Sequence, residues 1–501
     1  MKLRRKRVKP IALDDVTIID DARLRKAITA ASLGNAMEWF DFGVYGFVAY
    51  ALGKVFFPGA DPGVQMIAAL ATFSVPFLIR PLGGLFFGAL GDKYGRQKIL
   101  SITIIIMSLS TFAIGLIPSY ATIGIWAPVL LLLAKMAQGF SVGGEYTGAS
   151  IFVAEYSPDR KRGFMGSWLD FGSIAGFVLG AGVVVLISAI IGEAKFLDWG
   201  WRIPFFLALP LGVIGLYLRH ALEETPAFQQ HVEKLEQGDR EGLREGPKVS
   251  FKEIATKHWR SLLACIGLVI ATNVTYYMLL TYMPSYLSHN LHYSEDHGVL
   301  IIIAIMIGML FVQPVMGLLS DRFGRRPFVI IGSIALMVFA IPCFMMINSG
   351  VLGLIFAGLL ILAVILNSFT GVMASTLPAM FPTHIRYSAL ASAFNISVLI
   401  AGLTPTVAAW LVESSGDLYM PAYYLMVVAV VGLTTGIMMK ETANKPLRGA
   451  TPAASDLAEA KEILQEHHDN IEQKIEDIND EIEQLEQKRK HLINQHPSIN
   501  E

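Results

Sequence analysis

The chain has 501 residues, of which 53% are hydrophobic and only 16% are charged, and its mean hydropathy is +0.52. This composition is more apolar than that of soluble globular domains, so it excludes an ordinary soluble protein and favours a membrane protein. The 40 basic and 41 acidic side chains nearly cancel to a net charge of -1, which gives no indication of a nucleic-acid partner.

The N-terminal arm, residues 1–27, begins with basic residues but then carries four aspartates where a signal peptide needs an apolar run. We therefore expect a cytoplasmic arm and not a cleaved signal. Two cysteines occur, Cys265 and Cys343, each within an apolar run. This placement predicts small buried thiols and neither a disulfide framework nor a metal site.

Twelve apolar segments are long enough to cross a bilayer, which takes ~20 residues at ~1.5 Å of rise per residue. We expect these spans near residues 28–53, 65–91, 99–118, 124–154, 163–192, 201–219, 259–287, 297–319, 328–348, 352–379, 387–412 and 419–439. Basic residues gather in alternate connections, and short basic loops stay in the cytoplasm. Both termini are therefore predicted to be cytoplasmic.

The spans divide into two six-helix halves, 28–219 and 259–439, separated by a long charged connector at 220–258 that we expect in the cytoplasm. Residues 440–501 are polar and are predicted to form a cytoplasmic tail. The fold class is therefore an all-α integral membrane protein with two six-helix pseudo-repeats.

A nine-residue motif occurs once in each half at the cytoplasmic end of the second span, as GALGDKYGR and GLLSDRFGR. The copies are offset by 229 residues, which is the pattern of two parallel repeats. We interpret them as gating anchors at the helix ends, since glycines permit close helix contact and an acid can meet a helix dipole. The motif residues are Gly88, Asp92, Gly95, Arg96, Gly317, Asp321, Gly324 and Arg325.

A second pair of motifs, PDRKR at 158–162 and PTHIR at 382–386, lies in matching loops. This doubled pattern resembles the major facilitator superfamily over residues 20–440. The segments NAMEWFDFGVYG, IRPLGG, KMAQGFSVGGEYTGA and DWGWRIPF are similar to its metabolite:proton symporter branch, and the polar tail to the osmosensory transporters within it. One departure is Lys135, where many relatives have an arginine that could form a bidentate contact.

Ionisable groups inside the membrane are costly and usually face a cavity or a partner. All those within the predicted spans, apart from end residues, lie in the N-terminal half. The proton-coupling candidates are Glu38, Asp41, Glu145 and Asp170. Glu38 and Asp41 share one helix face because they are three residues apart. The alternative is a fixed ion-pair network with Arg80 and Lys135, and for Asp170 a cap on a polar patch.

The resemblance implies small zwitterions such as proline, glycine betaine and ectoine as substrates, with a proton as coupling ion and no bound cofactor. A quaternary ammonium favours aromatic faces, and a carboxylate needs a cation. The substrate-binding candidates are Trp39, Phe40, Tyr45, Arg80, Lys135, Tyr146, Trp168, Tyr276, Tyr277 and Tyr282. Helix packing or interfacial anchoring is the alternative for each single aromatic residue.

Residues 461–495 of the tail repeat aliphatic side chains every seven residues, which predicts a coiled coil and a homodimer. Its core positions are Leu464, Ile471, Ile475, Ile478, Ile482, Leu485, Arg489 and Leu492. The alternative is a solvated single helix. The resemblance implies that Arg489 belongs to an antiparallel pair.

The spans and motifs predict a transporter and not an enzyme. The resemblance implies a proton symporter of the bacterial inner membrane for zwitterionic osmolytes, activated by hyperosmotic stress, and we expect anionic lipids as further partners. Two alternatives stay open. One is a proton symporter for a carboxylate metabolite such as a keto acid or citrate. The other is a membrane osmosensor that signals through its tail without transport.

Overall fold

The computed structural model describes residues 12–13, 16–94, 96–220, 256–291 and 295–495. The predicted connector at 220–258 therefore lies almost wholly outside the described residues. Side chains at a few further positions, including 91–101, 292–297 and much of the distal tail, are likewise outside the description.

Within the described ranges the chain folds into long helices that follow the twelve predicted spans. In the N-terminal half these are α1 (Asp21–Phe56), α2 (Pro62–Tyr94), α3 (Arg96–Leu116), α5 (Trp126–Ser141) with α6 (Glu145–Glu155), α7 (Arg162–Ile191) and α9 (Ile203–Phe206) with α10 (Ala208–His220). Short helical pieces at α4 (Tyr120–Ile123), η2 (Asp159–Lys161), α8 (Glu193–Asp198) and η3 (Gly200–Arg202) lie between them.

The C-terminal half repeats this arrangement. Its helices are α14 (Trp259–Tyr276) continued by η4 (Tyr277–Tyr282), α15 (Met283–Ser285) and η5 (Tyr286–Asn290), then α16 (Glu295–Phe323), α17 (Arg325–Ile347), α18 (Leu352–Ala379), α19 (Thr383–Ala401) with α20 (Thr404–Ser415), and α21 (Met420–Met438). Three predicted spans are interrupted: the fourth at 142–144 between α5 and α6, the sixth at Leu207 between α9 and α10, and the eleventh at 402–403 between α19 and α20.

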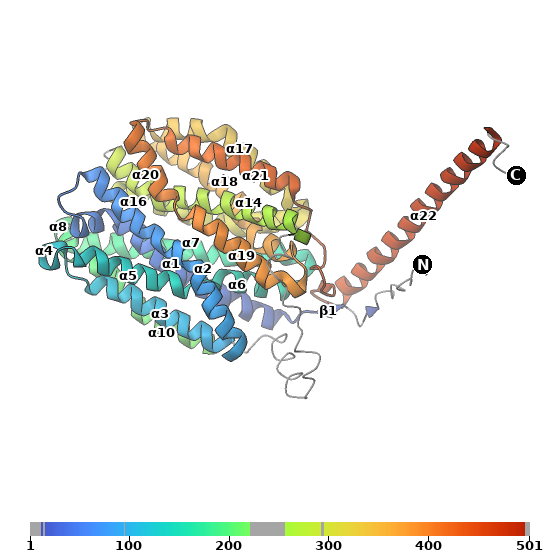
Figure 1. Cartoon of the computed structure of the whole chain (residues 1–501), viewed down its shortest axis with the longest axis horizontal. Helices are drawn as coiled ribbons and strands as arrows, with labels where there is room; N and C mark the ends of the chain where they lie inside the picture. The colour runs from blue at the N-terminus through green and yellow to red at the C-terminus, as the bar shows by residue number, and fades with distance from the viewer. Residues whose placement is uncertain (1–11, 14–15, 95, 221–255, 292–294, 496–501) are drawn as a thin grey trace.

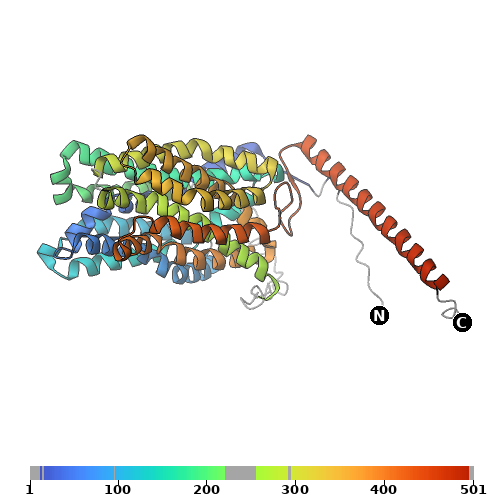
Figure 2. The same cartoon turned by 90° about the horizontal axis from the view of Figure 1, so that it is seen from above.

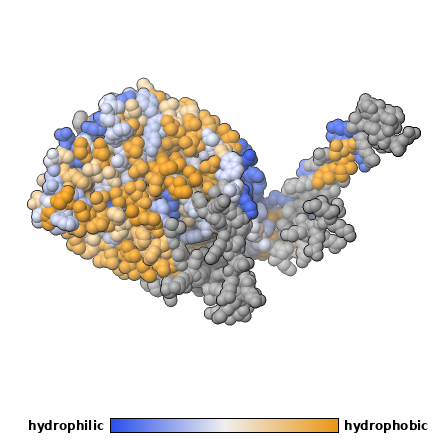
Figure 3. Space-filling view, in the orientation of Figure 1, coloured by the Kyte–Doolittle hydropathy of each residue, from blue (hydrophilic) through white to orange (hydrophobic). Residues whose placement is uncertain are grey.

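Nine helical segments of the described chain are long and apolar enough to cross a membrane. Two others, 102–116 and 200–216, are apolar but shorter. The remaining predicted span is α1, whose buried Glu38 and Asp41 lower its mean hydropathy. Apolar side chains cover much of the flank seen in Figure 3, as expected where helices face lipid.

The two halves meet along α7, which packs on α1 of its own half and on α16 and α18 of the other half. Small residues allow close helix contacts. At Gly83 of α2, an added Cβ would lie 1.8 Å from the Phe140 carbonyl oxygen of α5, so only glycine fits this crossing. The result is one bundle with its helices aligned along the long axis (Figures 1 and 2).

Both described ends of the chain emerge from one end of the bundle, which we call the terminal face (Figures 1 and 2). There β1 (Thr17–Ile18) pairs in parallel with β2 (Ala453–Ala454), which joins the segment before α1 to the segment after α21. The long helix α22 (Leu457–Gln495) then projects away from the bundle (Figure 2).

Candidate functional site

The centre of the bundle holds a buried ion pair between α1 and α2. Arg80 Nη2 donates to Glu38 Oε1 at 3.2 Å, and the two side chains are 5% and 0% exposed. The Arg80 Nε is buried and has no hydrogen-bond partner among the described residues. A guanidinium with spare donor capacity can bind a carboxylate that enters the site.

Aromatic rings lie close to this pair: Trp39 follows Glu38 on α1, and the charges of Arg80 and Glu38 both interact with Tyr277. The Trp39 ring lies 5.0 Å from that of Tyr276, 5.6 Å from Phe177 and 6.1 Å from Tyr277, measured between ring centroids. We call Trp39, Phe177, Tyr276 and Tyr277 the aromatic cage. Because α1 and α7 supply two rings and α14 with η4 the other two, the cage spans both halves.

Several buried polar atoms of the cage region lack hydrogen-bond partners within the described chain. They are Trp39 Nε1, the Tyr276 hydroxyl and Asn273 Nδ2. Asn273 of α14 lies one helical turn before Tyr276 and Tyr277, so it shares their face. Unsatisfied buried polar groups are costly, and a ligand that supplies partners would remove that cost.

Asp170 adds a second carboxylate to this centre. The Tyr146 hydroxyl of α6 lies 3.1 and 3.2 Å from the two Asp170 oxygens of α7. The Tyr146 ring stacks on Phe394 of α19 with a centroid distance of 4.9 Å, and the Arg80 guanidinium lies 5.7 Å from the centre of that same ring. Asp170 and the Glu38–Arg80 pair are therefore linked through Tyr146 and Phe394.

A separate polar cluster lies inside the N-terminal half. Asp41 accepts a hydrogen bond from the Thr111 hydroxyl at 2.7 Å and lies 3.5 Å from Gln138 Nε2. Lys135 Nζ donates to Gln138 Oε1 at 2.9 Å and sits 3.9 Å from the centre of the Tyr45 ring. Lys135 thus interacts with Asp41 through Gln138 and with the Tyr45 ring, and not with the Glu38–Arg80 pair.

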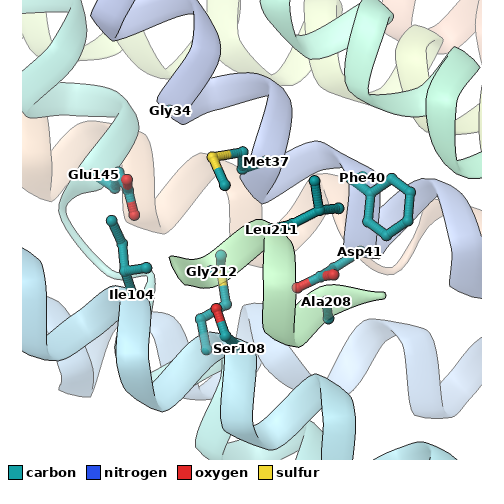
Figure 4. Close-up of a pocket in the computed structure, with 11 residues that line it drawn as sticks. Gly34, Met37, Phe40, Asp41, Ile104, Ser108, Glu145, Ala208, Leu211 and Gly212 are labelled. Atoms are coloured by element: carbon teal, nitrogen blue, oxygen red, sulfur yellow. The ribbon is translucent and has the colours of Figure 1, made fainter. Parts of the chain in front are cut away.

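Glu38 and Asp41 therefore have different partners although they are three residues apart. Asp41 also lines a small cavity between α1, α3 and α10, with Phe40 and Glu145 among its other walls (Figure 4). Figure 4 shows Asp41 and Glu145 on opposite sides of this cavity, with Met37 between them. Phe40 and Glu145 are thus placed beside Asp41 and not in the aromatic cage.

Two predicted substrate residues lie elsewhere. Trp168 packs on Leu24, Ile28 and Val153 near the terminal face. Tyr282 lies at the other end of the C-terminal half, with its ring 5.7 Å from that of Tyr286. Neither residue borders the aromatic cage.

The second copy of the gating motif joins the halves at the terminal face. The Asp321 carboxylate of α16 accepts hydrogen bonds from the backbone N–H groups of Gly163 and Phe164 at 2.7 and 2.8 Å, so it caps the N-terminus of α7. Arg325 pairs with Asp321 at 3.5 Å, and Gly324 has φ +93°, a left-handed conformation that suits glycine. Gly317 packs against Gly163 and Ser167.

The first copy of the motif, Gly88, Asp92, Gly95 and Arg96, falls on residues or side chains outside the described part of the structure. The same holds for Ile471, Ile475, Arg489 and Leu492 of the predicted coiled-coil core. Among the described core positions, Leu464 packs near Val16 and Ala454 at the root of α22. Ile478, Ile482 and Leu485 are 55%, 48% and 57% exposed.

Sequence reasoning missed Thr111, Gln138, Phe177, Asn273 and Phe394. Asn273 and Gln138 carry a usable signal, since each is a polar residue within an apolar helix. The two phenylalanines carry none, because an apolar ring in a membrane span is ordinary. No group of histidine, cysteine or acidic side chains in the described ranges has the geometry of a metal site.

Comparison with known proteins assigns both parts of the chain. Residues 26–454 match the family model "Sugar (and other) transporter", and residues 455–500 match "Osmosensory transporter coiled coil". The proline/betaine transporter of Salmonella typhimurium strain LT2 is 87% identical over 100% of both chains. The glycine betaine/proline/ectoine/pipecolic acid transporter OusA of Dickeya dadantii strain 3937 is 86% identical, again over 100% of both chains.

Among solved structures, the proton:xylose symporter XylE of the major facilitator superfamily, bound to 6-bromo-6-deoxy-D-glucose, superposes with a TM-score of 0.67. The identity is 18%, over 85% of this chain and 98% of XylE, so this likeness shows the fold alone. The two family matches and the relatives at 86% and 87% identity establish that the chain is a transporter and not an enzyme. The chain belongs to the sugar (and other) transporter family of the major facilitator superfamily, among the proline/betaine transporters that carry an osmosensory coiled coil.

Proposed function

We propose that the chain is a proton-coupled symporter that imports zwitterionic osmolytes, namely proline, glycine betaine and ectoine, and that hyperosmotic stress activates it. The observation that carries this proposal is the Glu38–Arg80 pair beside the aromatic cage, at the interface of the two halves. The names of the relatives at 86% and 87% identity support the same substrates.

The chemistry of the centre suits a zwitterion. Arg80 can hold the carboxylate of the substrate, since its Nε is available for a further hydrogen bond. The faces of Trp39, Tyr276 and Tyr277 can hold the ammonium group through cation–π attraction. Asp170, close to the cage through Tyr146, adds a negative charge that favours the ammonium end.

Proton coupling requires a carboxylate that alternates between its neutral and charged forms as the site changes sides. Asp41 is the first candidate, because Thr111, Gln138 and Lys135 surround it and it lines the cavity in Figure 4. Glu38 is the second, since a proton there would free Arg80 for the substrate. Glu145 and Asp170 are the further candidates.

A symporter for a carboxylate metabolite is less well supported, because the cage would then contribute nothing and Asp170 would repel the substrate. A sensor without transport would have no use for polar groups buried at the interface of the halves. We also propose that the halves 28–219 and 259–439 move as rigid bodies. The protein lies in the bacterial inner membrane, with its terminal face toward the cytoplasm.

The tail suggests the partners. Ile478, Ile482 and Leu485 repeat at heptad spacing and are about half exposed, and a second copy of α22 could cover them in an antiparallel homodimer. Basic side chains near the terminal face, such as Arg25 and Lys161, can attract anionic lipids.

The test is uptake of labelled glycine betaine, proline and a keto acid into proteoliposomes, with and without an imposed proton gradient and an osmotic upshift. We expect gradient-driven accumulation of the two zwitterions only. Asp41→Asn and Glu38→Gln should impair accumulation more than substrate exchange, whereas the exposed control Glu193→Gln should change neither. Full accumulation in both variants would contradict the coupling assignment, and uptake of the keto acid alone would contradict the substrate class.

A further inference from the structure

The segment between α21 and α22, residues 439–455, crosses the terminal face and contacts both halves. We call it the strap. It contains no regular structure before β2 (Figure 1), yet Met439, Ala443 and Leu447 are buried. Its backbone and side chains form hydrogen bonds along most of its length, so it is a docked element and not a loose linker.

Toward the C-terminal half the strap is anchored at three points. The Glu441 carboxylate accepts from the backbone N–H groups of Arg325 and Arg326, both at 3.0 Å, and caps α17. Asn444 Nδ2 donates to the Asp321 carbonyl at 3.1 Å. Farther along, the Arg448 carbonyl accepts from the Thr383 N–H at 3.0 Å.

Toward the N-terminal half the contacts are different in kind. Arg162 Nη1 donates to the Lys445 carbonyl at 3.0 Å, and Asp159 Oδ2 accepts from the Ala453 N–H at 3.1 Å. Leu447, which is 4% exposed, packs with Ala154 of α6 on one side and Ala379 of α18 on the other. Leu447 thus occupies the seam between the halves as a wedge.

Other bonds across the same seam have the same consequence. Arg386 of α19 pairs with Glu155 of α6 at 2.6 Å, one residue beyond Ala154. Asp321 caps α7 nearby. Any motion that separates the two halves at the terminal face must break these bonds and remove Leu447 from one of its two alanine neighbours.

We propose that the strap is a latch that holds the terminal face closed. It opens when residues 439–448 release Arg162 and Ala154 of the N-terminal half and stay attached to the C-terminal half, while β2 stays paired with β1. The attachments at Glu441, Asn444 and Arg448 and the continuity with α21 favour this direction. Gly449, with φ +82°, lies just past these anchors, where the backbone turns toward β2. The inference rests on the proposed function, because only an alternating-access transporter needs to open this face.

The first test measures opening directly, without transport. The full-length protein carries Cys265→Ala and Cys343→Ala, and Ser375→Cys as a reporter, since Ser375 is 1% exposed and lies one helical turn deeper than Ala379. We expect Leu447→Ala to speed labelling of the reporter by a bulky polar maleimide about tenfold, because the closed state loses a buried contact. The control Leu457→Ala, which alters an exposed leucine at the start of α22, should leave the rate unchanged.

The second test determines the direction of release. A disulfide between Leu447→Cys and Ala154→Cys should block uptake of glycine betaine until it is reduced, whereas one between Leu447→Cys and Ala379→Cys should leave uptake intact. Inhibition by both pairs or by neither would overturn one-sided release, and equal labelling of Leu447→Ala and the parent protein would overturn the latch. If the protein transports none of the zwitterions, labelling still reports on the latch, so the two proposals fail separately.

Discussion

Arg80 of α2 and Glu38 of α1 form an ion pair of 3.2 Å from which solvent is almost completely excluded. Each charge is tolerable at this depth because the other compensates it. The pair therefore couples the stability of the bundle to the chemistry of the substrate site. A substrate carboxylate that binds Arg80 during transport must therefore replace part of the negative charge that Glu38 places beside the guanidinium.

Breaking this pair from one side should be costly. We expect Glu38→Gln and Arg80→Gln each to destabilise the protein by about 3–5 kcal/mol, because each leaves a buried charge without its partner. The double variant should recover a large part of that loss. Thermal unfolding in detergent, arranged as a double-mutant cycle, measures this coupling, and additive effects of the two substitutions would contradict it.

The aromatic cage should matter most for quaternary ammonium substrates. Replacing Trp39 by leucine removes the ring face but keeps an apolar side chain, and we expect the KM for glycine betaine to rise by about tenfold, since cation–π contacts contribute about 1–2 kcal/mol in dry sites. Tyr282→Phe serves as the control, because Tyr282 lies outside the cage. Equal KM values for Trp39→Leu and the parent protein would show that the ammonium group does not bind at the aromatic cage.

The crossing of α2 and α5 should not tolerate a methyl group. Gly83→Ala would place a carbon 1.8 Å from the Phe140 carbonyl oxygen, a backbone atom that cannot move alone. We expect a large drop in folded yield or thermal midpoint. Gly182→Ala is the matched control, since a Cβ at Gly182 meets no atom within 4 Å. Similar behaviour of the two variants in size-exclusion chromatography and thermal unfolding would argue against this crossing.

Stability should depend on Glu441 in a pH-dependent way. Burial alone would raise the pKa of Glu441, but the backbone N–H groups of Ala443, Arg325, Arg326 and Thr442 lower it below its ordinary value. A lowered pKa in the folded state means that the ionised carboxylate stabilises the fold at neutral pH. That contribution declines as the pH falls through the folded-state pKa.

We therefore expect Glu441→Gln to lower the thermal midpoint at pH 7 and to converge with the parent protein under acidic conditions below the ordinary range for glutamate. The measurement is thermal unfolding in detergent across a pH series. A difference between the two proteins that stayed constant with pH would show that ionisation of Glu441 does not contribute.

The exposed aliphatic positions of α22 should control self-association. Ile482→Lys puts a charge at a predicted core position, whereas Glu483→Lys changes the charge of the adjacent exposed position. We expect Ile482→Lys to reduce cross-linking between copies and to shift or shorten osmotic activation, while basal transport continues. Glu483→Lys should have a much smaller effect on cross-linking. Identical activation curves for the parent and Ile482→Lys would remove the regulatory role.

Much of the fold could be predicted from the sequence, because the bilayer imposes a length and an apolarity on every span. The repeated motif indicated the two halves, and Asp321 occupies the helix-capping position expected of an acid at the end of a span. The breaks at 142–144 and 402–403 could not be predicted, since the residues on both sides remain apolar and the interruption reflects packing around small residues.

The site could be predicted only in part. The sequence indicated Glu38, Arg80 and Asp170, because an ionisable side chain inside the membrane costs free energy unless it has a partner or a function. The position of these charges in the sequence could not show that Lys135 is connected to Asp41 through Gln138, nor that Trp168 lies near the terminal face. Both placements depend on how the helices are rotated about their axes in the packed bundle. The docking of the strap could not be predicted from the sequence either, because its contacts are individual hydrogen bonds between segments far apart in the chain.

The pairing of β1 with β2 has a consequence for biosynthesis. The Thr17 and Thr451 hydroxyl groups, 3.2 Å apart, are separated by 434 positions along the chain. A ribosome makes β1 before any span is inserted, yet its partner strand emerges only after α21. The β1–β2 pair therefore cannot form until nearly the whole polypeptide has left the ribosome. Its closure marks a molecule in which both halves have already been made, and a product released before residue 453 would lack that final join between the beginning and the end of the chain.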